Sequence, residues 1–270
     1  MTQMPEPYAI YAIKYAYRNA MRAENMIFSD AHDVPMPLDY YVWAIVGKNR
    51  TFVVDTGFDE KEAAKRKRDH LRSPKEALQY VAVDADKVED VIITHMHYDH
   101  CGNLSQFPNA KLYLQEREMY FATGRHMREK LFRHSFCADY VVDIIHALYD
   151  DRVDYIDGVR EIAPGISVHH VGGHTHGLQV VRVWTARGWV VLASDAAHFY
   201  DNMNRRNPFK IVFDVGEMLE AYTTVAALAD SPQHIIAGHD PLVMQRFPAV
   251  SKETEGIAVR VDVQPLNWDD

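Results

Sequence analysis

The sequence contains few cysteines and no long apolar segment. Its two cysteines, Cys101 and Cys137, are too few for a disulfide framework. No apolar run approaches the roughly 20 residues that a membrane-spanning helix requires. The opening stretch MTQMPEPYAIYAIKYAYRNAM also lacks the basic segment and following apolar segment of a secretory signal. We therefore expect a cytoplasmic protein that makes no contact with a membrane.

An excess of positive charge is missing as well. The formal net charge is −9 at pH 7, which gives no support for a nucleic-acid partner. The basic stretch KEAAKRKRDH, residues 61–70, also contains acidic residues, and we interpret it as the solvated face of one helix. Hydrophobic residues at 47% and charged residues at 25% are ordinary proportions for a globular protein. We expect one domain over residues 1–270.

Histidine, by contrast, is abundant, with 15 residues in the chain. Three of the histidines and an aspartate fall within six residues of the stretch VIITHMHYDHCGN, residues 91–103. The β-branched residues before them are typical of a short buried strand. The histidines therefore stand at the end of an expected strand, where their side chains could converge on a ligand.

Hydrophobic periodicity predicts a similar order of elements in both halves of the chain. We expect strands over 8–18, 88–94, 110–115, 166–173 and 234–240, with hairpins over 40–58 and 178–195 that turn at 47–49 and 186–188. Helices are expected over 60–70, from residue 73 onward, over 116–151 and over 216–231. Strands followed by flanking helices indicate an α/β fold in which two sheets pack face to face with helices outside.

The histidine cluster has the chemistry of a metal site. Side chains repeat every two residues along an extended chain, so His95 and His97 point the same way, and Asp99 continues the phase. His100 faces elsewhere unless the chain turns, and Gly102 could help it turn. Imidazole and carboxylate ligands suit divalent transition metals, zinc above all. One zinc could take the first two histidines and a second could take Asp99 and His100.

Each pair needs further ligands from elsewhere in the chain. Three candidates follow expected strands: His174 in VGGHTHG, Asp195 in VLASDAAH and His239 in IAGHDP. A carboxylate at the edge of a buried strand is costly unless it is paired, and metal coordination removes that cost. Cys101 directly follows the cluster and could be a ligand, but we favour a small residue packed behind the site.

The same residues resemble a known family. THMHYDHCGN resembles the HxHxDH signature of the metallo-β-lactamase superfamily, and the later His, Asp and His look like that family's third, fourth and fifth metal motifs. VVDTGF, residues 53–58, resembles its Asp-Thr-Gly turn, in which Asp55 would support the ligands without binding metal. The resemblance covers about residues 40–245 and implies an αββα sandwich with two mixed sheets.

The resemblance also implies two sets of ligands and a cofactor of two Zn²⁺ ions, although other divalent transition metals could bind. The first zinc would be held by His95, His97 and His174, and the second by Asp99, His100 and His239, with Asp195 bridging the two. A hydroxide between the ions would be the nucleophile, since zinc lowers the pKa of bound water to about 7.

Within the superfamily, the sequence looks most like the lactonase branch, which includes N-acyl homoserine lactonases and pyridoxolactonase. Asp195 in place of a cysteine and the presence of His100 separate it from the best-known β-lactamases. The resemblance implies a quorum-quenching type of hydrolase that opens the ester bond of a small lactone, with Asp99 protonating the leaving alkoxide. Hydrolysis of another ester, an amide, a thioester or a β-lactam is the alternative, and a non-enzymatic metal-holding sensor is a remoter one.

One residue departs from the lactonase pattern. Lactonases usually carry a Tyr three residues after the bridging Asp, where its hydroxyl bonds the substrate carbonyl, but this chain has His198 there. A neutral imidazole can also donate, so His198 is a candidate catalytic and substrate-binding residue, and Tyr200 could substitute for it. His176, where the family usually has Pro, is interpreted as a supporting or exposed residue.

The substrate pocket is expected from the helical segment 116–151. Phe132 and Phe136 are candidate substrate contacts, although each could simply belong to the core. Arg205 or Arg206 could meet a substrate carboxylate, but solvated charge is the commoner outcome. Apolar residues in the helical segment also make a homodimer plausible.

Overall fold

The computed structural model describes residues 5–28 and 32–268, and its first sheet has eight strands. The strand order is β13-β1-β2-β3-β5-β6-β7, with β4 paired to β1. Pairing is antiparallel from β13 to β3 and parallel from β3 to β7, so the sheet is mixed. The strands are β1 (Ala9–Arg18), β2 (Leu38–Val46), β3 (Thr51–Val54), β4 (Asp69–His70), β5 (Asp90–Ile92), β6 (Lys111–Gln115), β7 (Val153–Ile156) and β13 (Ala258–Arg260).

The second sheet has five strands in the order β12-β11-β10-β9-β8. Only β11 and β12 pair in parallel, and the other neighbours are antiparallel. The strands are β8 (Val159–Ala163), β9 (Ile166–His170), β10 (Gln179–Thr185), β11 (Gly188–Ser194) and β12 (Ile235–Ala237).

The two sheets pack face to face around a shared apolar core. Trp43 and Phe52 of the first sheet lie in one buried cluster with Val181 and Leu192 of the second. The central strand β2, LDYYVWAIV, is almost entirely buried, which explains why its hydrophobic run is nearly continuous rather than alternating. Burial of this cluster on both sides holds the sheets in fixed relation to each other.

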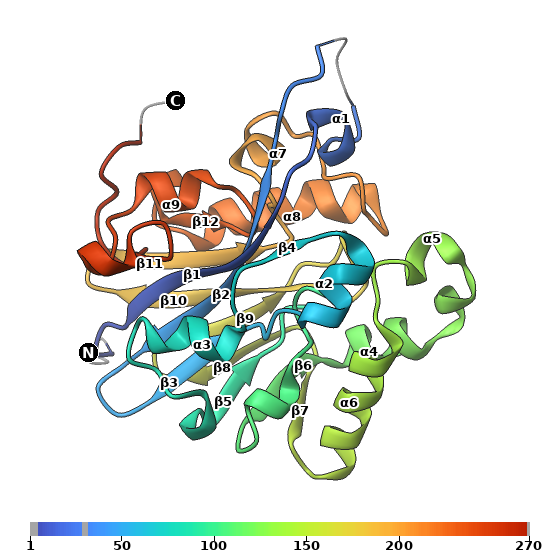
Figure 1. Cartoon of the computed structure of the whole chain (residues 1–270), viewed down its shortest axis with the longest axis horizontal. Helices are drawn as coiled ribbons and strands as arrows, with labels where there is room; N and C mark the ends of the chain where they lie inside the picture. The colour runs from blue at the N-terminus through green and yellow to red at the C-terminus, as the bar shows by residue number, and fades with distance from the viewer. Residues whose placement is uncertain (1–4, 29–31, 269–270) are drawn as a thin grey trace.

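Helices cover the outer faces of both sheets (Figure 1). Residues of α3 and α6 pack in the apolar cluster on the outside of the first sheet, and α8 packs on the second. The helices are α1 (Arg22–Asn25), α2 (Glu60–Arg66), α3 (Pro74–Gln79), α4 (Glu116–Thr123), α5 (Lys130–Arg133), α6 (Ala138–Tyr149), α7 (Tyr200–Asn204), α8 (Val215–Leu228) and α9 (Leu242–Arg246). The layers are thus helix, sheet, sheet, helix, and the predicted αββα sandwich is confirmed.

Two predicted helices differ from the observed ones. The helix expected over 60–70 ends at Lys67, which adopts a left-handed conformation with φ of 57°, and residues 69–70 pair with β1 instead. The segment expected to be helical over 116–151 is divided into α4, α5, α6 and a 3₁₀ turn at 125–128. A cap in the left-handed conformation ends a helix whatever the propensity of the residues that follow.

The short strands β7, β8 and β13 were not predicted. Each has five residues or fewer, and β8 alternates partly exposed residues with exposed ones over most of its length. Such strands are defined by pairing with a neighbour rather than by their own hydrophobic pattern. Among the described residues, no helix is both long enough and apolar enough to cross a membrane.

Candidate metal centre

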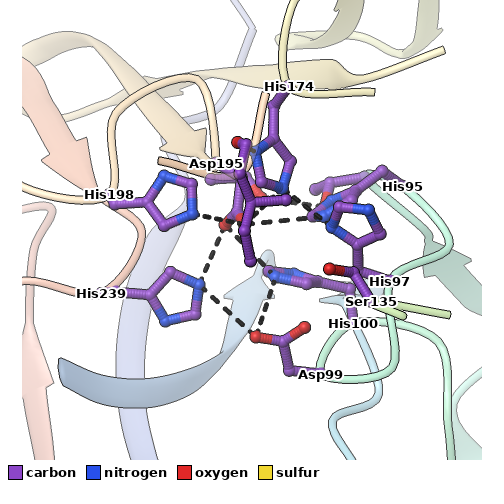
Figure 2. Close-up of polar contacts among 12 residues, drawn as sticks. His95, His97, Asp99, His100, Ser135, His174, Asp195, His198 and His239 are labelled. Carbon is purple, nitrogen blue, oxygen red and sulfur yellow. Dashed lines mark hydrogen bonds and ion pairs between the residues drawn. The ribbon is translucent and has the colours of Figure 1, made fainter. Parts of the chain in front are cut away.

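The predicted ligands meet at one edge of the two sheets (Figure 2). His95 and His97 follow β5, His174 follows β9, Asp195 follows β11 and His239 follows β12. All of them therefore lie just beyond the carboxyl ends of strands. A fixed sheet edge can hold side chains from distant parts of the chain within bonding distance of one ion.

The first donor set consists of His95, His97 and His174. Nδ1 of His97 and Nε2 of His174 lie 2.8 Å apart. Oδ2 of Asp195 lies 3.0 Å from Nε2 of His174 and 3.6 Å from Nε2 of His95. One donor atom from each of these four residues falls within 4.8 Å of every other. All four side chains are buried, so the group is shielded from bulk water.

The second donor set consists of Asp99, His100 and His239. Its donor atoms also lie within 4.8 Å of one another. The other carboxylate oxygen of Asp195, Oδ1, faces this set, at 3.2 Å from Nε2 of His100 and 2.9 Å from Nε2 of His239. Asp195 therefore turns one oxygen toward each set, as a carboxylate that bridges two ions must.

The cluster fits divalent ions better than it fits a hydrogen-bonded network. Nε2 of His95 is buried and has no hydrogen-bond partner among the described residues, and Oδ2 of Asp195 is 3.6 Å away from it. Buried polar atoms are rarely left unpaired, so this nitrogen indicates a ligand. Burial holds the pKa values of His95 and His97 well below the ordinary range of histidine, which favours the neutral, metal-binding form.

Asp55 orients a donor from outside the cluster. One of its oxygens lies 2.7 Å from Nδ1 of His100, and both oxygens accept hydrogen bonds from Thr94, at 2.8 Å from the backbone nitrogen and 2.8 Å from the hydroxyl. Asp55 has a φ of 62°, a conformation that aspartate tolerates better than most residues. The contact with His100 is the one that the supporting role implied by the sequence resemblance requires, and that role stays a prediction.

Backbone carbonyls orient two further histidines. Nδ1 of His174 lies 2.7 Å from the carbonyl oxygen of Ile211, and Nδ1 of His239 lies 2.9 Å from that of Asp39. A hydrogen bond at one ring nitrogen places the proton there and leaves the other nitrogen free to bind an ion. Both histidines are thus held with Nε2 unprotonated, which is the tautomer that a metal ligand at this nitrogen requires.

Glu118 is a buried carboxylate that sequence reasoning missed. It lies on α4, and its oxygens accept hydrogen bonds of 2.9 Å from the backbone nitrogens of Met96 and Gly177. These two residues belong to the loops that carry the first donor set, so Glu118 links the two loops by hydrogen bonds. Burial raises the pKa of Glu118 above its ordinary value. No local pattern distinguishes this residue from the other acids of its helix.

Small residues permit the close approach of the ligand-bearing loops. A Cβ added at Gly238 would lie 2.5 Å from the backbone oxygen of Ser194, so only glycine lets β12 bring His239 beside Asp195. We expected Gly102 to help the chain turn, but in the structure it permits a close approach of two loops, as Gly238 does. A Cβ there would lie 2.6 Å from the backbone oxygen of Gly57.

His198 lies inside the cluster rather than beside it. Its Nε2 is 2.9 Å from Oδ2 of Asp195, and its ring stacks on Phe209 with centroids 3.8 Å apart. Burial lowers the pKa of His198 to about 3, so the ring is neutral at pH 7. Its other nitrogen, Nδ1, is buried without a hydrogen-bond partner among the described residues.

The structure separates the remaining candidates. Tyr200 lies away from the donors, with its ring 4.5 Å from the guanidinium of Arg246, where it lines a separate cavity of about 460 Å³. Phe136 packs edge-on against His97, with ring centroids 4.8 Å apart. Cys101 is buried, and its thiol donates to the backbone of Met96, which agrees with a packed residue rather than a ligand.

Two cavities open from the cluster and share four lining residues: His97, His134, His174 and Ile211. The first, of about 70 Å³, contains most of the donors and is walled on one side by arginines. The second, of about 270 Å³, is mostly apolar and includes Phe132. We call the apolar part the apolar chamber, and its other members are Phe121, Leu131, Val212 and Phe213.

Curated proteins with similar sequences include lactonases. An N-acyl homoserine lactonase of Agrobacterium fabrum is 27% identical over 198 residues, which is 67% of this chain and 66% of that protein. The chain spans about half to two thirds of the length of the curated relatives it matches.

Solved structures share the architecture. The crystal structure of a quorum-quenching N-acyl homoserine lactone lactonase superposes with a TM-score of 0.73 at 20% identity, over 89% of this chain and 95% of that one. A dizinc quorum-quenching lactonase, AidC, superposes with a TM-score of 0.64 at 15% identity, over 86% and 87%. At these identities the likeness establishes the fold. Residues 36–239, from just before β2 to the last predicted ligand, match the metallo-beta-lactamase superfamily, and the chain belongs to that superfamily.

Proposed function

We propose that the protein is a di-zinc hydrolase that opens the ester bond of a small lactone, with N-acyl homoserine lactones as the first candidates. The observation that carries the proposal is the arrangement of Asp195, whose two oxygens face two separate donor sets. The names of the relatives support the lactone, and the seven side chains support two ions. Zinc is proposed because imidazole and carboxylate are its usual ligands.

Two bound ions would supply an activated water at neutral pH and would polarise the substrate carbonyl. The chain's own residues hold and orient the reacting groups. Most of the donor side chains are almost fully buried, while the side chain of Asp99 is 11% exposed. Asp99 is therefore the donor side chain that is more open to the cavity than its buried neighbours.

Asp99 is proposed as the acid that returns a proton to the leaving alkoxide. Its Oδ2 lies 3.8 Å from Nε2 of His100 and 3.9 Å from Nε2 of His239, at the edge of the second donor set. A carboxyl group at this edge can pass a proton to an oxygen that departs on the same side. Asp99→Asn keeps the shape of the side chain and removes the titrating group, so it separates this role from metal binding.

A metal analysis paired with a substrate panel tests the proposal. Purified protein is expected to hold about two equivalents of zinc and to hydrolyse lactones faster than simple esters, amides, thioesters and β-lactams. Chelation is expected to remove activity, and zinc to restore it. Lactone rates no better than the rest of the panel would reject the lactone, and full activity after exhaustive chelation would reject metal-dependent hydrolysis altogether.

A further inference from the structure

One wall of the metal-site cavity is basic, although the chain is acidic overall. Arg18, Arg66 and Arg68 line the cavity together with Asp99 and Tyr40. We call these three arginines the basic wall. The apolar chamber adjoins this cavity at two other donors, His97 and His174, which line both. The cavity therefore offers two chemically different surroundings to a bound molecule.

The pairing of β1 with β4 brings two of the arginines together. Ala16 pairs with His70 and Tyr17 with Asp69, so Arg18 directly follows the paired residues of β1 and Arg68 directly precedes β4. Both arginines line the same small cavity, where two like charges repel each other. Such a pair is consistent with an anion that binds between or beside the two guanidinium groups.

The three arginines are not equally free to bind a ligand. Arg66 already has hydrogen-bond partners within the protein. It donates to Glu62 at 2.5 Å, to the carbonyl oxygen of His134 at 2.7 Å and to that of Phe136 at 3.1 Å. Arg18 makes an ion pair with Glu24. Arg66 thus supports the wall, and Arg18 carries a charge that is partly compensated.

Arg68 has no carboxylate partner within 4 Å among the described residues. Its Nε donates to the hydroxyl of Tyr98 at 3.1 Å and its Nη1 donates to the carbonyl oxygen of Arg66 at 2.8 Å. Both contacts hold the side chain in place, and neither neutralises its charge. Its Nη2 donates to no described residue. The Asp99 carboxylate lines the same cavity and attracts this guanidinium, but it lies beyond ion-pair distance. A guanidinium whose hydrogen bonds go to neutral groups and which lines a small cavity is prepared for an anionic ligand.

We propose that Arg68, with Arg18 beside it, binds a carboxylate of the substrate, so that the preferred substrate is a small lactone or ester carrying an anionic group near the reacting bond. This inference rests on the proposed hydrolysis and narrows its substrate. The cavity of about 70 Å³ leaves space for a small group on this side, and the apolar chamber receives the uncharged remainder. N-acyl homoserine lactones, the first candidates of the proposed function, carry no such charge and would offer Arg68 no anionic partner.

A matched pair of lactones tests the inference. The probes are 5-oxotetrahydrofuran-2-carboxylate and its primary amide, which have nearly the same shape and differ in charge. We expect kcat/KM to be at least about tenfold higher for the carboxylate, since a hydrogen bond to a charged group has that effect. In Arg68→Gln the ratio of the two kcat/KM values is expected to fall at least tenfold, mainly through the KM of the carboxylate.

Two further variants control for folding and for general charge. Arg68→Lys keeps the charge and loses the two-pronged geometry, so the ratio should fall less than in Arg68→Gln. Arg205→Gln removes an arginine that is paired with Asp201 and lies outside the basic wall, and the ratio should not change. If Arg68→Gln does not fold, Arg68→Lys and Arg18→Gln carry the test, and an unchanged ratio in both overturns the inference.

Failure of the inference can be distinguished from failure of the proposed function. Equal kcat/KM for the two lactones, with both hydrolysed, overturns the anionic substrate and leaves lactone hydrolysis standing. If neither lactone nor any ester is hydrolysed, the proposed function fails, and titration calorimetry with glutarate and butyrate then decides. Tighter binding of glutarate, lost in Arg68→Gln, would still support a carboxylate site, whereas equal binding in the unmutated protein would reject it.

Discussion

The floor and the walls of the cavity differ in how they are held. The floor consists of the seven donor residues, most of them fully buried and several locked by a hydrogen bond to an outer partner such as Asp55 or the carbonyl of Ile211. The walls consist of the basic wall and the apolar chamber, which come from the end of β1, the end of α2 and the turn after it, the divided segment 116–151, and residues 212–213. The floor is thus suited to one kind of chemistry, and the walls can vary with the substrate.

This difference predicts two classes of variant. A change in the floor should lower the rate for every substrate by the same factor, because it acts on the reaction itself. A change in the walls should alter the ratio of rates between substrates, because it acts on parts of the molecule away from the reacting bond. A floor variant that changes only substrate preference would contradict this distinction between floor and walls.

The largest effect is expected for Asp195→Asn. The change removes the charge that both donor sets share, and Asn cannot bridge two ions as a carboxylate does. Loss of zinc and of activity should exceed the roughly 100-fold upper range seen for outer-shell partners, and should be equal for all substrates. Metal content by mass spectrometry and kcat/KM for two unlike lactones provide the measurement.

The matched control for this change is Asp201→Asn, six residues further along the chain. Asp201 is 37% exposed and pairs with Arg22 and Arg205, away from the donors. Its substitution should leave the zinc content at the value of the unmutated protein. Retention of two equivalents of zinc by Asp195→Asn would show that this carboxylate does not bridge.

A smaller effect on the floor is expected for Asp55→Asn. Asparagine tolerates the positive φ of this position, so the variant removes charge without backbone strain. Without the carboxylate beside Nδ1, His100 loses its orientation and some of its basicity. Zinc affinity should fall about 10- to 100-fold, with activity recovering at high zinc concentration. Competition with a chelator measures the affinity, and unchanged affinity would remove Asp55 from the support of the site.

The residues of the floor could be predicted because the signals that identify them each lie within a short stretch of sequence. Four of the predicted ligands fall within six residues after one strand, and His174, Asp195 and His239 each follow a hydrophobic run. Period-two geometry and strand ends carry this information without knowledge of the fold. The hairpin turns and α8 were found for the same reason, since their signals lie within a single stretch of chain.

The walls could not be predicted because they depend on contacts between distant segments. We interpreted residues 61–70 as one solvated helix face, and this was wrong for Arg66 and Arg68. The left-handed Lys67 ends the helix, and pairing with β1 turns the next residues toward the donors. Glu118 likewise looks like any helical acid until the loops at Met96 and Gly177 fold over it.

His198 contacts a floor residue and also lines the cavity, so its substitution tests the distinction between floor and walls. The sequence made His198 a candidate donor to the substrate carbonyl, while the structure gives its Nε2 a partner in Asp195. His198→Phe should lower kcat/KM about tenfold or more in either case, since a lost hydrogen bond to a charged group contributes ~1.5–3 kcal/mol. Zinc content separates the two roles, because only the role through Asp195 predicts weaker metal binding.

The pH dependence of this variant adds a second readout. The pKa of His198 is lowered to about 3 by burial, so its neutral form is present throughout the range above that value. The factor by which His198→Phe lowers kcat/KM should therefore be constant between pH 6 and 9. A factor that falls as the pH rises through this range would show that the charged imidazole acts instead.

The smallest effect is expected in the apolar chamber, for Phe132→Ala. Phe132 is partly exposed and shares its contacts with Phe121 and Phe213, so the chamber keeps most of its surface without it. Peripheral contacts of this kind usually contribute less than about 1 kcal/mol, which corresponds to about fivefold or less. KM should rise by that factor for a lactone with an alkyl chain and stay constant for the bare ring, while Tyr120→Ala, on an exposed face of α4, should change neither. Equal losses for both lactones would place Phe132 with the floor, and the division between chemistry and substrate choice would then have to be drawn elsewhere.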